Sequence, residues 1–168
     1  MEKVKIIKVS DGDLIAEVER LADSIWHEHY TPIIGTAQVE YMLKKIQSKG
    51  AISNQINKEG YLYYLLRDKN GRWIGYFAVV PRQTELFLSK FYIRYENRGK
   101  GYGKDAMEFI KSTAKDKGLA KIVLVTNKKN INSINAYKRL GFTITAPVVT
   151  DIGDGFVMDD YKMELHVL

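Results

Sequence analysis

The segment Arg98-Gly99-Lys100-Gly101-Tyr102-Gly103-Lys104 marks the point where the hydrophobic pattern of this chain changes its period. Residues 86–93 before it read as a β-strand, with aromatic residues at positions 87, 91 and 92. After it, apolar residues return at helical spacing, at Ala106, Phe109, Ile110 and Thr113. The segment is therefore predicted to be a glycine-rich connection from a strand into a helix.

This composition suits an anion site of pyrophosphate size. Three alternating glycines allow the backbone to approach a ligand without obstruction from Cβ atoms. The start of a helix offers unpaired N–H groups, and Arg98, Lys100 and Lys104 add positive charge. The spacing matches neither the dinucleotide fingerprint G-x-G-x-x-G nor the P-loop G-x-x-x-x-G-K-[ST]. Taken by itself, the segment is an anion cradle or a flexible basic connector, and both interpretations stay open.

The residues before this segment predict an antiparallel meander. Strands are expected over 61–66 and 73–80, joined by Asp68-Lys69-Asn70-Gly71, in which Asn-Gly is a strong hairpin signal. A turn over 81–84 leads into the strand 86–93. Further upstream we expect a strand over 4–9 and a helix that starts near Asp11 and ends before Pro32. A second helix is expected from Thr36 to about Gly50.

The residues after it predict a crossover and a C-terminal pair of strands. The apolar run 122–126 completes a strand–helix–strand crossover with 86–93. A short helix is expected over 132–140, closing strands over 142–145 and 161–167, and an acidic loop over 151–160. The sum is an α/β fold: a single mixed, mostly antiparallel sheet with a βαβ crossover and flanking helices, in one domain over residues 1–168.

Composition excludes several classes of protein. At 168 residues and 45% hydrophobic content the chain can bury a core, which argues against a disordered or fibrous protein. The absence of cysteine excludes disulfides, thiolate zinc sites and a cysteine nucleophile, and three histidines offer little for a metal site, so we expect no metal. No secretory signal or membrane-spanning stretch is visible, and a cytoplasmic protein is expected. The net charge of +6 favours an anionic partner without identifying it.

Two motifs together resemble those of the GNAT superfamily of acetyl-CoA-dependent N-acetyltransferases. Arg98-x-x-Gly101-x-Gly103 is similar to the family's acetyl-CoA motif R/Q-x-x-G-x-G/A. Asn130 followed by Ala136-Tyr137-Lys138-Arg139-Leu140-Gly141-Phe142 resembles its N…A-x-x-Y-x-x-x-G-F helix. The resemblance covers residues 61–142 as the acetyl-CoA-binding core, with 1–60 as the variable acceptor-side region. Residues 143–168, the acidic loop and closing strand, resemble bacterial polyamine N-acetyltransferases more weakly.

The resemblance implies acetyl-CoA as co-substrate and assigns residues to it. The backbone of Phe91, Tyr92 and Ile93 would pair with the pantetheine arm, and an N–H near Phe91 would polarise the thioester carbonyl. The pyrophosphate would rest on the segment Arg98, Gly99, Lys100, Gly101, Tyr102, Gly103 and Lys104. Tyr137 is the expected catalytic acid, because a phenol with a reference pKa of about 10 stays protonated at neutral pH. Asn130 would bind CoA or cap the helix that follows it.

The general base is left open. Some family members carry a Glu on the strand that corresponds to 86–93, whereas this chain has Ser89 and Lys90 there. Glu85 at the start of the strand is one substitute. His27, Glu28 and His29, in the first helix, are others, and a chain of water molecules is a further alternative.

The acceptor is expected to be a primary amine that attacks the thioester directly in a ternary complex. Asp151, Asp154, Asp159 and Asp160 would attract a cationic amine, or they form an ordinary solvated loop. A polyamine, an amino-acid-like amine, an aminoglycoside and a protein N-terminus all remain open.

The alternative function is a non-catalytic CoA-binding or regulatory module of the same fold. Nucleic-acid binding through Arg94–Lys104 and Lys128-Lys129 lacks any recognised motif, so neither a nucleic-acid partner nor a membrane partner is expected. A homodimer stays open.

Overall fold

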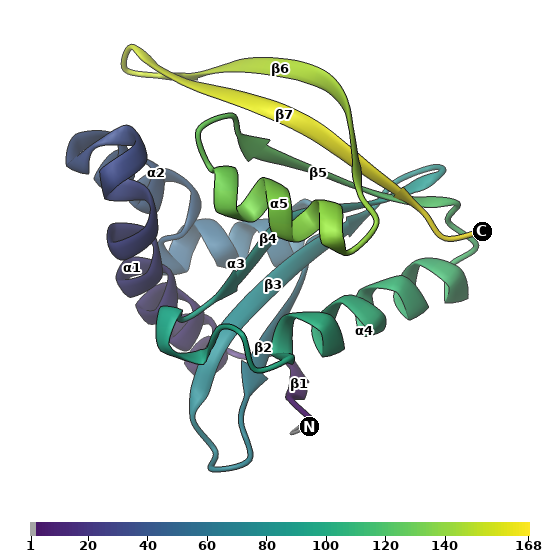
Figure 1. Cartoon of the computed structure of the whole chain (residues 1–168). Coiled ribbons are helices and arrows are strands. Elements are labelled where there is room, and N and C mark those ends of the chain that lie inside the picture. The colour runs from purple at the N-terminus through teal and green to yellow at the C-terminus, as the bar shows by residue number, and fades with distance from the viewer. Residues whose placement is uncertain (1–2) are drawn as a thin grey trace.

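A computed structural model describes residues 3–168 and contains a seven-stranded sheet in the order β1-β2-β3-β4-β5-β7-β6 (Figure 1). All neighbouring pairs are antiparallel except β4 and β5, which are parallel. The strands are β1 (Lys5–Lys8), β2 (Leu62–Arg67), β3 (Trp73–Pro81), β4 (Glu85–Ile93), β5 (Lys121–Asn127), β6 (Thr143–Gly153) and β7 (Phe156–His166). The prediction of a mixed, mostly antiparallel sheet with one βαβ crossover is confirmed.

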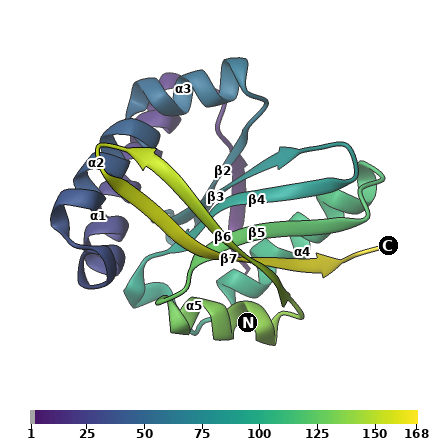
Figure 2. The same cartoon turned by 90° about the horizontal axis from the view of Figure 1, so that it is seen from above.

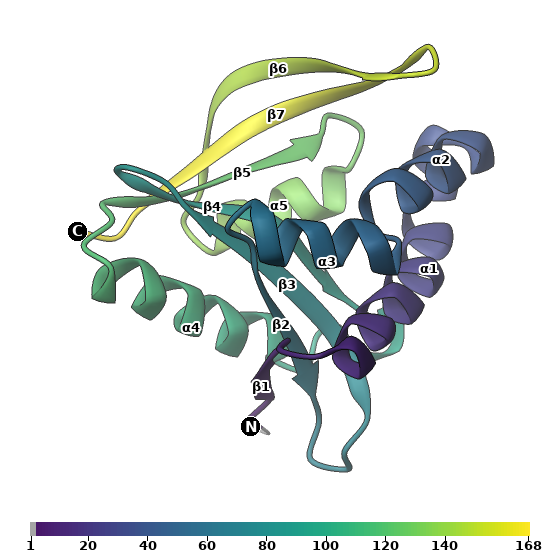
Figure 3. The ribbon, with the colours of Figure 1, turned by 180° about the vertical axis from the view of Figure 1, so that it is seen from behind.

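Helices cover both faces of the sheet (Figure 3). Helices α1 (Gly12–Ile34), α2 (Thr36–Ile46) and α3 (Lys49–Lys58) pack on one face, around Trp26, Tyr63 and Tyr76. Helices α4 (Tyr102–Asp116) and α5 (Ile131–Arg139) lie on the other face, over a second core that includes Phe77 and Met107. A 3₁₀ turn, η1 (Tyr95–Asn97), connects β4 to the glycine-rich segment. Within residues 3–168, none of the helices is both long and apolar enough to span a membrane.

The first helical region differs from the prediction in two ways. Helix α1 continues through Pro32 to Ile34, because a proline this near a helix end removes only one hydrogen bond and Ile34 still packs on the core. A third helix, α3, was not predicted. The Ser48 side chain caps it by accepting from the Ala51 amide at 3.2 Å. Gly50 does not break this helix, because it lies in the first turn, where N–H groups have no partner within the helix in any case.

The predicted acidic loop is wrong: most of residues 151–160 belong to the β6–β7 hairpin (Figure 1). The turn consists of Asp154 and Gly155, which both have positive φ, at 52° and 76°. Asp-Gly in this conformation is a type I′ turn, whose twist matches that of the strands it joins. Figure 2 shows the hairpin tip reaching across to α2. One of the apolar positions predicted to face the core from helix α4 is corrected by the structure: Phe109 is 36% exposed and lies at the edge of the core.

Candidate active site

The sheet divides between β4 and β5. Their parallel pairing runs only from Glu85 to Phe87 on β4, opposite Lys121 to Val123 on β5. Beyond Phe87 the two strands have no register with each other. A bulge accompanies the division, because Ala78 and Val79 of β3 pair with Lys90 and Leu88 and leave Ser89 as the extra residue.

The division exposes one edge of β4 with defined polarity. The Arg94 amide donates to the Ile74 carbonyl of β3 at 2.8 Å. Since the N–H groups of a strand alternate between its two edges, the amides of Phe91 and Ile93 point the other way, towards the diverging β5. The Ile93 carbonyl lies on this open edge as well, where it accepts from Arg98 Nε at 3.0 Å. Phe91 therefore presents a backbone donor to the space between the strands.

A cavity of about 560 Å³, which we call the glycine-loop cavity, occupies this space. It is lined by β4, the glycine-rich segment, α5 and His29 of α1. Of the residues expected at the donor site it brings together all except Lys100, namely Phe91, Tyr92, Ile93, Arg98, Gly99, Gly101, Tyr102, Gly103, Lys104, Asn130 and Tyr137. Lys100 is exposed and does not line the cavity.

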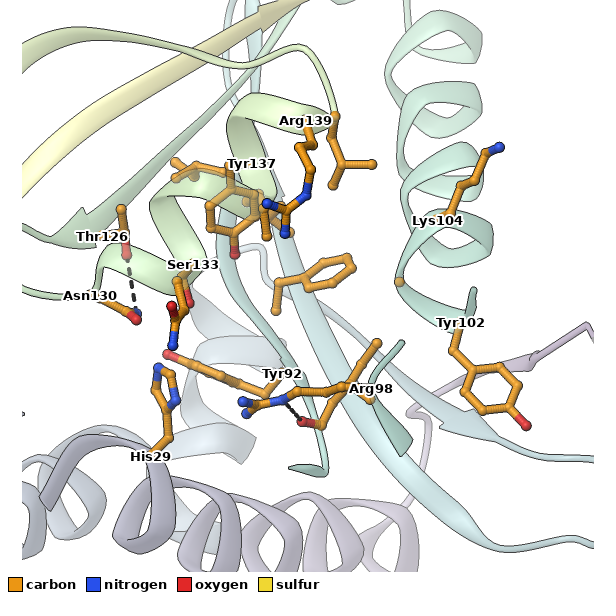
Figure 4. A pocket seen from close by; sticks show the side chains of 18 of the residues that line it. His29, Tyr92, Arg98, Tyr102, Lys104, Thr126, Asn130, Ser133, Tyr137 and Arg139 are labelled. Carbon is orange, nitrogen blue, oxygen red and sulfur yellow. Dashed lines mark hydrogen bonds between the residues drawn. The ribbon is translucent and has the colours of Figure 1, made fainter. Parts of the chain in front are cut away.

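The N-terminus of α4 faces the cavity without a side-chain cap. Gly101 is the N-cap residue, with a left-handed φ of 88° and no side-chain hydrogen bond to the first turn. Gly99 also has positive φ, at 74°, so the backbone bends twice within three residues. Arg98 and Lys104 supply positive charge to the cavity (Figure 4). Arg139, at the end of α5, supplies a further positive charge that the sequence analysis did not predict. A helix start with accompanying cations is a general arrangement for binding phosphate.

Tyr137 extends from α5 into the same cavity, with its hydroxyl directed towards β4 (Figure 4). Its ring contacts Phe91 edge-on at a centroid distance of 6.4 Å, and Phe142 at 5.6 Å. Burial raises the pKa of Tyr137 well above its ordinary value, and the neighbouring Tyr30 adds to the effect. The side chain therefore stays protonated throughout the neutral range, as a proton donor must.

Asn130 lies between β5 and α5 and is 4% exposed. It is the N-cap residue of α5, but its side chain makes no capping bond to that helix. Its Nδ2 donates instead to Thr126 Oγ1 at 3.5 Å, while the residue lines the cavity.

A second cavity, of about 480 Å³, lies on the α1–α3 side of the division, and we call it the hairpin cavity. Tyr30, Ser89, Tyr92 and Val125 line both cavities, so the two meet at the opening between β4 and β5. Three side chains of α2, those of Gln38, Tyr41 and Lys45, form hydrogen bonds to the β6–β7 hairpin. Gln38 Nε2 donates to the Val157 carbonyl at 2.9 Å, and Tyr41 Oη and Lys45 Nζ donate to the Ile152 carbonyl at 2.7 and 2.6 Å.

Asp160 of β7 is the buried acid of the hairpin cavity, at 4% exposure. Burial, together with the neighbouring charge of Asp159, raises the pKa of its carboxyl to about 6. The other acids of its segment, Asp151, Asp154 and Asp159, are exposed. The sequence pattern thus included Asp160 among four acids but gave no sign that it is the buried one of the four.

The residues expected as candidate bases lie in different places. His27 faces Asp23 and Glu40, at 3.5 and 3.8 Å, and Glu28 is exposed on the same helix. Glu85 lies where β4 still pairs with β5, so it is separated from the opening. His29 lines the glycine-loop cavity, where burial and the field of Arg98 lower its pKa. Across residues 3–168 there is no cluster of three or more His, Cys, Asp or Glu side chains that could hold a metal ion.

Solved structures with the same fold are numerous. The PaiA N-acetyltransferase of Thermoplasma acidophilum, in complex with coenzyme A, superposes with a TM-score of 0.79 at 19% identity, over 97% of this chain and 98% of that one. Spermidine N-acetyltransferase of Vibrio cholerae, in complex with CoA and spermine, gives a TM-score of 0.70 at 14% identity, over 97% and 95%. Ard1 of Thermoplasma volcanium gives 0.70 at 22% identity, over 98% of both chains.

No curated protein matches the sequence significantly. The family model described as "Acetyltransferase (GNAT) family" matches residues 19–142, which is most of the chain. The match spans α2, α3, β2–β5, α4 and α5, and so includes both the divided strands and the glycine-rich segment. The chain therefore belongs to the GNAT acetyltransferase family.

Proposed function

We propose that this protein transfers the acetyl group of acetyl-CoA to a primary amine, by direct attack within a ternary complex. The observation that carries the proposal is the opening between β4 and β5, where the two cavities meet. Acetyl-CoA would occupy the glycine-loop cavity, and the amine would reach it from the hairpin cavity.

The residues around the glycine-loop cavity fit acetyl-CoA. The uncapped start of α4, with Arg98 and Lys104 beside it, suits the pyrophosphate. The open edge of β4 at Phe91 and Ile93 suits the amide groups of pantetheine, which would extend the sheet as an added strand. Asn130 offers a buried amide to the same ligand. The thioester supplies the acetyl group and a sulfur leaving group.

The protein would assist the transfer at two atoms of the thioester, the carbonyl oxygen and the sulfur. The backbone N–H of Phe91 would donate to the carbonyl oxygen as negative charge develops there; one such donor lowers an acyl-transfer barrier by about 3 kcal/mol. As the amine nitrogen bonds to the carbonyl carbon and the C–S bond breaks, Tyr137 would give its proton to the sulfur. The nitrogen, which still carries one proton more than an amide does, would release it to solvent, and the phenol would regain a proton from solvent after product release.

Asp160 is the carboxylate placed to hold the acceptor's ammonium group and to take its proton. It lines the hairpin cavity together with Tyr30, whose pKa is raised partly by the charge of Asp160. The Tyr30 and Tyr92 hydroxyls are hydrogen-bonded at 3.0 Å and belong to both cavities, so they connect Asp160 with the opening. Asp160 by itself would suit a polyamine or any other small cationic amine.

The test is a turnover screen. Purified protein is incubated with acetyl-CoA and a panel of polyamines, amino acids, aminoglycosides and peptides, and free CoA thiol is measured. We expect amine-dependent thiol release. Binding of acetyl-CoA without thiol release on any amine would support a non-catalytic module instead.

A further inference from the structure

The hairpin cavity contains a buried cation that the proposed chemistry does not use. Lys90 is 8% exposed and follows the bulged Ser89 on β4. Its neighbour Phe91 packs on Tyr137, so strand alternation directs Lys90 to the opposite, α1–α3 side of the sheet. Its ammonium lies 5.5 Å from the centre of the Tyr61 ring and donates to Ser89 Oγ at 2.6 Å.

The ammonium of Lys90 is under-compensated by the protein. Within residues 3–168 that hydrogen bond to Ser89 is its one bond, although an ammonium has three donors. No carboxylate of the described residues forms an ion pair with it. The field of Glu59 reaches it, yet Glu59 is exposed and its Oε2 accepts from Asn54 at 2.8 Å. A buried charge left in this state is costly unless a ligand completes its bonds.

Burial lowers the pKa of Lys90 to about 8, so that it is still mainly protonated at neutral pH. The rest of the hairpin cavity combines apolar and aromatic residues, such as Trp26, Met42 and Met158, with polar ones, of which the charged Lys45 and Glu59 are exposed. Its buried charges are therefore one cation, Lys90, and one anion, Asp160, among the residues that the structure describes.

We propose that Lys90 binds a carboxylate of the acceptor, so that the acceptor is a free amino acid with an apolar side chain. The inference rests on the proposed function and narrows its substrate class. Ser89, which holds the Lys90 ammonium, lines both cavities, so a carboxylate bound there lies next to the opening. An α-amino group is separated from its carboxylate by one carbon, and it would lie at that opening.

The same charge disfavours polyamines. A polyamine would bring a second ammonium group into the space beside Lys90, where like charges repel in a poorly solvated setting. An amino acid instead gives the two buried charges of the cavity, Lys90 and Asp160, one partner each. Its side chain would lie among the apolar and aromatic residues.

The experiment compares acceptors that differ only in the carboxylate. L-Methionine is paired with 3-(methylsulfanyl)propylamine and L-phenylalanine with 2-phenylethylamine, with spermidine as a polyamine reference, and kcat/KM is measured for each. Lys90→Met removes the charge with little change in volume. Lys58→Met is the matched control, because Lys58 is exposed at the end of α3 and lies outside both cavities.

We expect the wild type and Lys58→Met to favour the amino acids on the order of tenfold to a hundredfold, the value of a charge-assisted bond. In Lys90→Met the preference should vanish through a higher KM. Equal or better turnover of the decarboxylated amines or spermidine by the wild type would overturn the proposal. Equal loss on both members of a pair in Lys90→Met would also overturn it, because Lys90 would then act on the chemistry.

A binding measurement separates this inference from the proposed function. Calorimetric titration of L-methionine into protein saturated with CoA needs no turnover. Binding to the wild type and to Lys58→Met, with at least about tenfold weaker binding to Lys90→Met, would support the carboxylate site even if no amine is acetylated. Equal affinity for all three proteins, or no binding, would refute it whatever the turnover screen shows.

Discussion

Tyr137 and Asp160 are ionisable residues whose neutral forms are favoured by burial, one on each side of the opening between β4 and β5. Among residues 3–168 neither side chain has a hydrogen-bonding partner that fixes its proton, so each is suited to exchange a proton with a ligand. Replacing Tyr137 should change kcat, whereas replacing Asp160 should change both the stability of the fold and the pH dependence of activity.

Replacing Tyr137 with Phe should lower kcat by about 10²- to 10⁴-fold, the usual contribution of a positioned acid. The ring contacts with Phe91 and Phe142 remain, so acetyl-CoA affinity and thermal stability should stay close to those of the wild type. Steady-state kinetics and calorimetry measure both. Tyr64→Phe, which alters a phenol outside both cavities, is the control, and wild-type kcat in Tyr137→Phe would refute the acid role.

Asp160→Asn should stabilise the fold while it reduces activity. The folded-state pKa of about 6 lies above the ordinary value of 3.8, so the folded state binds a proton more readily than the unfolded chain does. Wild-type stability therefore falls as pH rises from about 4 to about 6, by about 3 kcal/mol. The variant should be the more stable protein at pH 7.5 and equal to the wild type near pH 3.5, as denaturant unfolding can measure.

The same variant should lose the acid limb of the pH–rate profile. Wild-type kcat/KM is expected to fall below about pH 6 as Asp160 becomes protonated. An unchanged limb in Asp160→Asn would assign the base to another group, such as His29.

At the scale of elements, helix α4 has a glycine with positive φ at each end, Gly101 at 88° and Gly118 at 70°. Only Gly101 lines the glycine-loop cavity. Comparing substitutions at the two glycines therefore distinguishes the effect of backbone strain from an effect on ligand binding.

Gly101→Ala and Gly118→Ala should each destabilise the protein by about 1 kcal/mol, because an L side chain is strained in this conformation. Gly101→Ala alone should also weaken acetyl-CoA binding, by tenfold or more, since the start of α4 must shift. Calorimetric titration together with denaturant unfolding measures both effects. Equal acetyl-CoA affinity in the two variants would contradict the phosphate cradle.

In the whole molecule, the glycine-loop cavity is lined by residues of α1, β4, α4, β5 and α5. Because these elements come from distant parts of the chain, binding of acetyl-CoA there should stabilise the entire fold. Acetyl-CoA at a hundred times its Kd adds about 2.7 kcal/mol. For a chain of this length that corresponds to a rise in Tm of roughly 5 to 10 °C. Differential scanning fluorimetry with acetyl-CoA, and with acetate as the control, measures it, and an unchanged Tm would contradict the donor site.

Local elements could be predicted from the sequence where their conformation depends on a few neighbouring residues. The Asn70-Gly71 turn, the strand–glycine–helix transition at Arg98–Lys104 and the stop at Gly141 each depend on a few neighbouring residues. The Asp154-Gly155 turn has equally local chemistry, and the acidic character of its surroundings obscured it. Helix α3 does not follow from the sequence pattern, because Gly50 resembles a helix stop, whereas the structure places it in the first turn of α3.

The mixed sheet, the crossover and the family could be predicted from the sequence, because periodicity, turn residues and two spaced motifs are properties of neighbouring positions. Which charged side chains are buried depends on the folded chain. Asp160 and Lys90 resemble many other acids and lysines of the chain until the hairpin, α1 to α3 and the bulged β4 enclose them. Burial, which shifts a pKa and leaves a charge in need of a partner, arises from contacts between distant segments, and no local pattern records it.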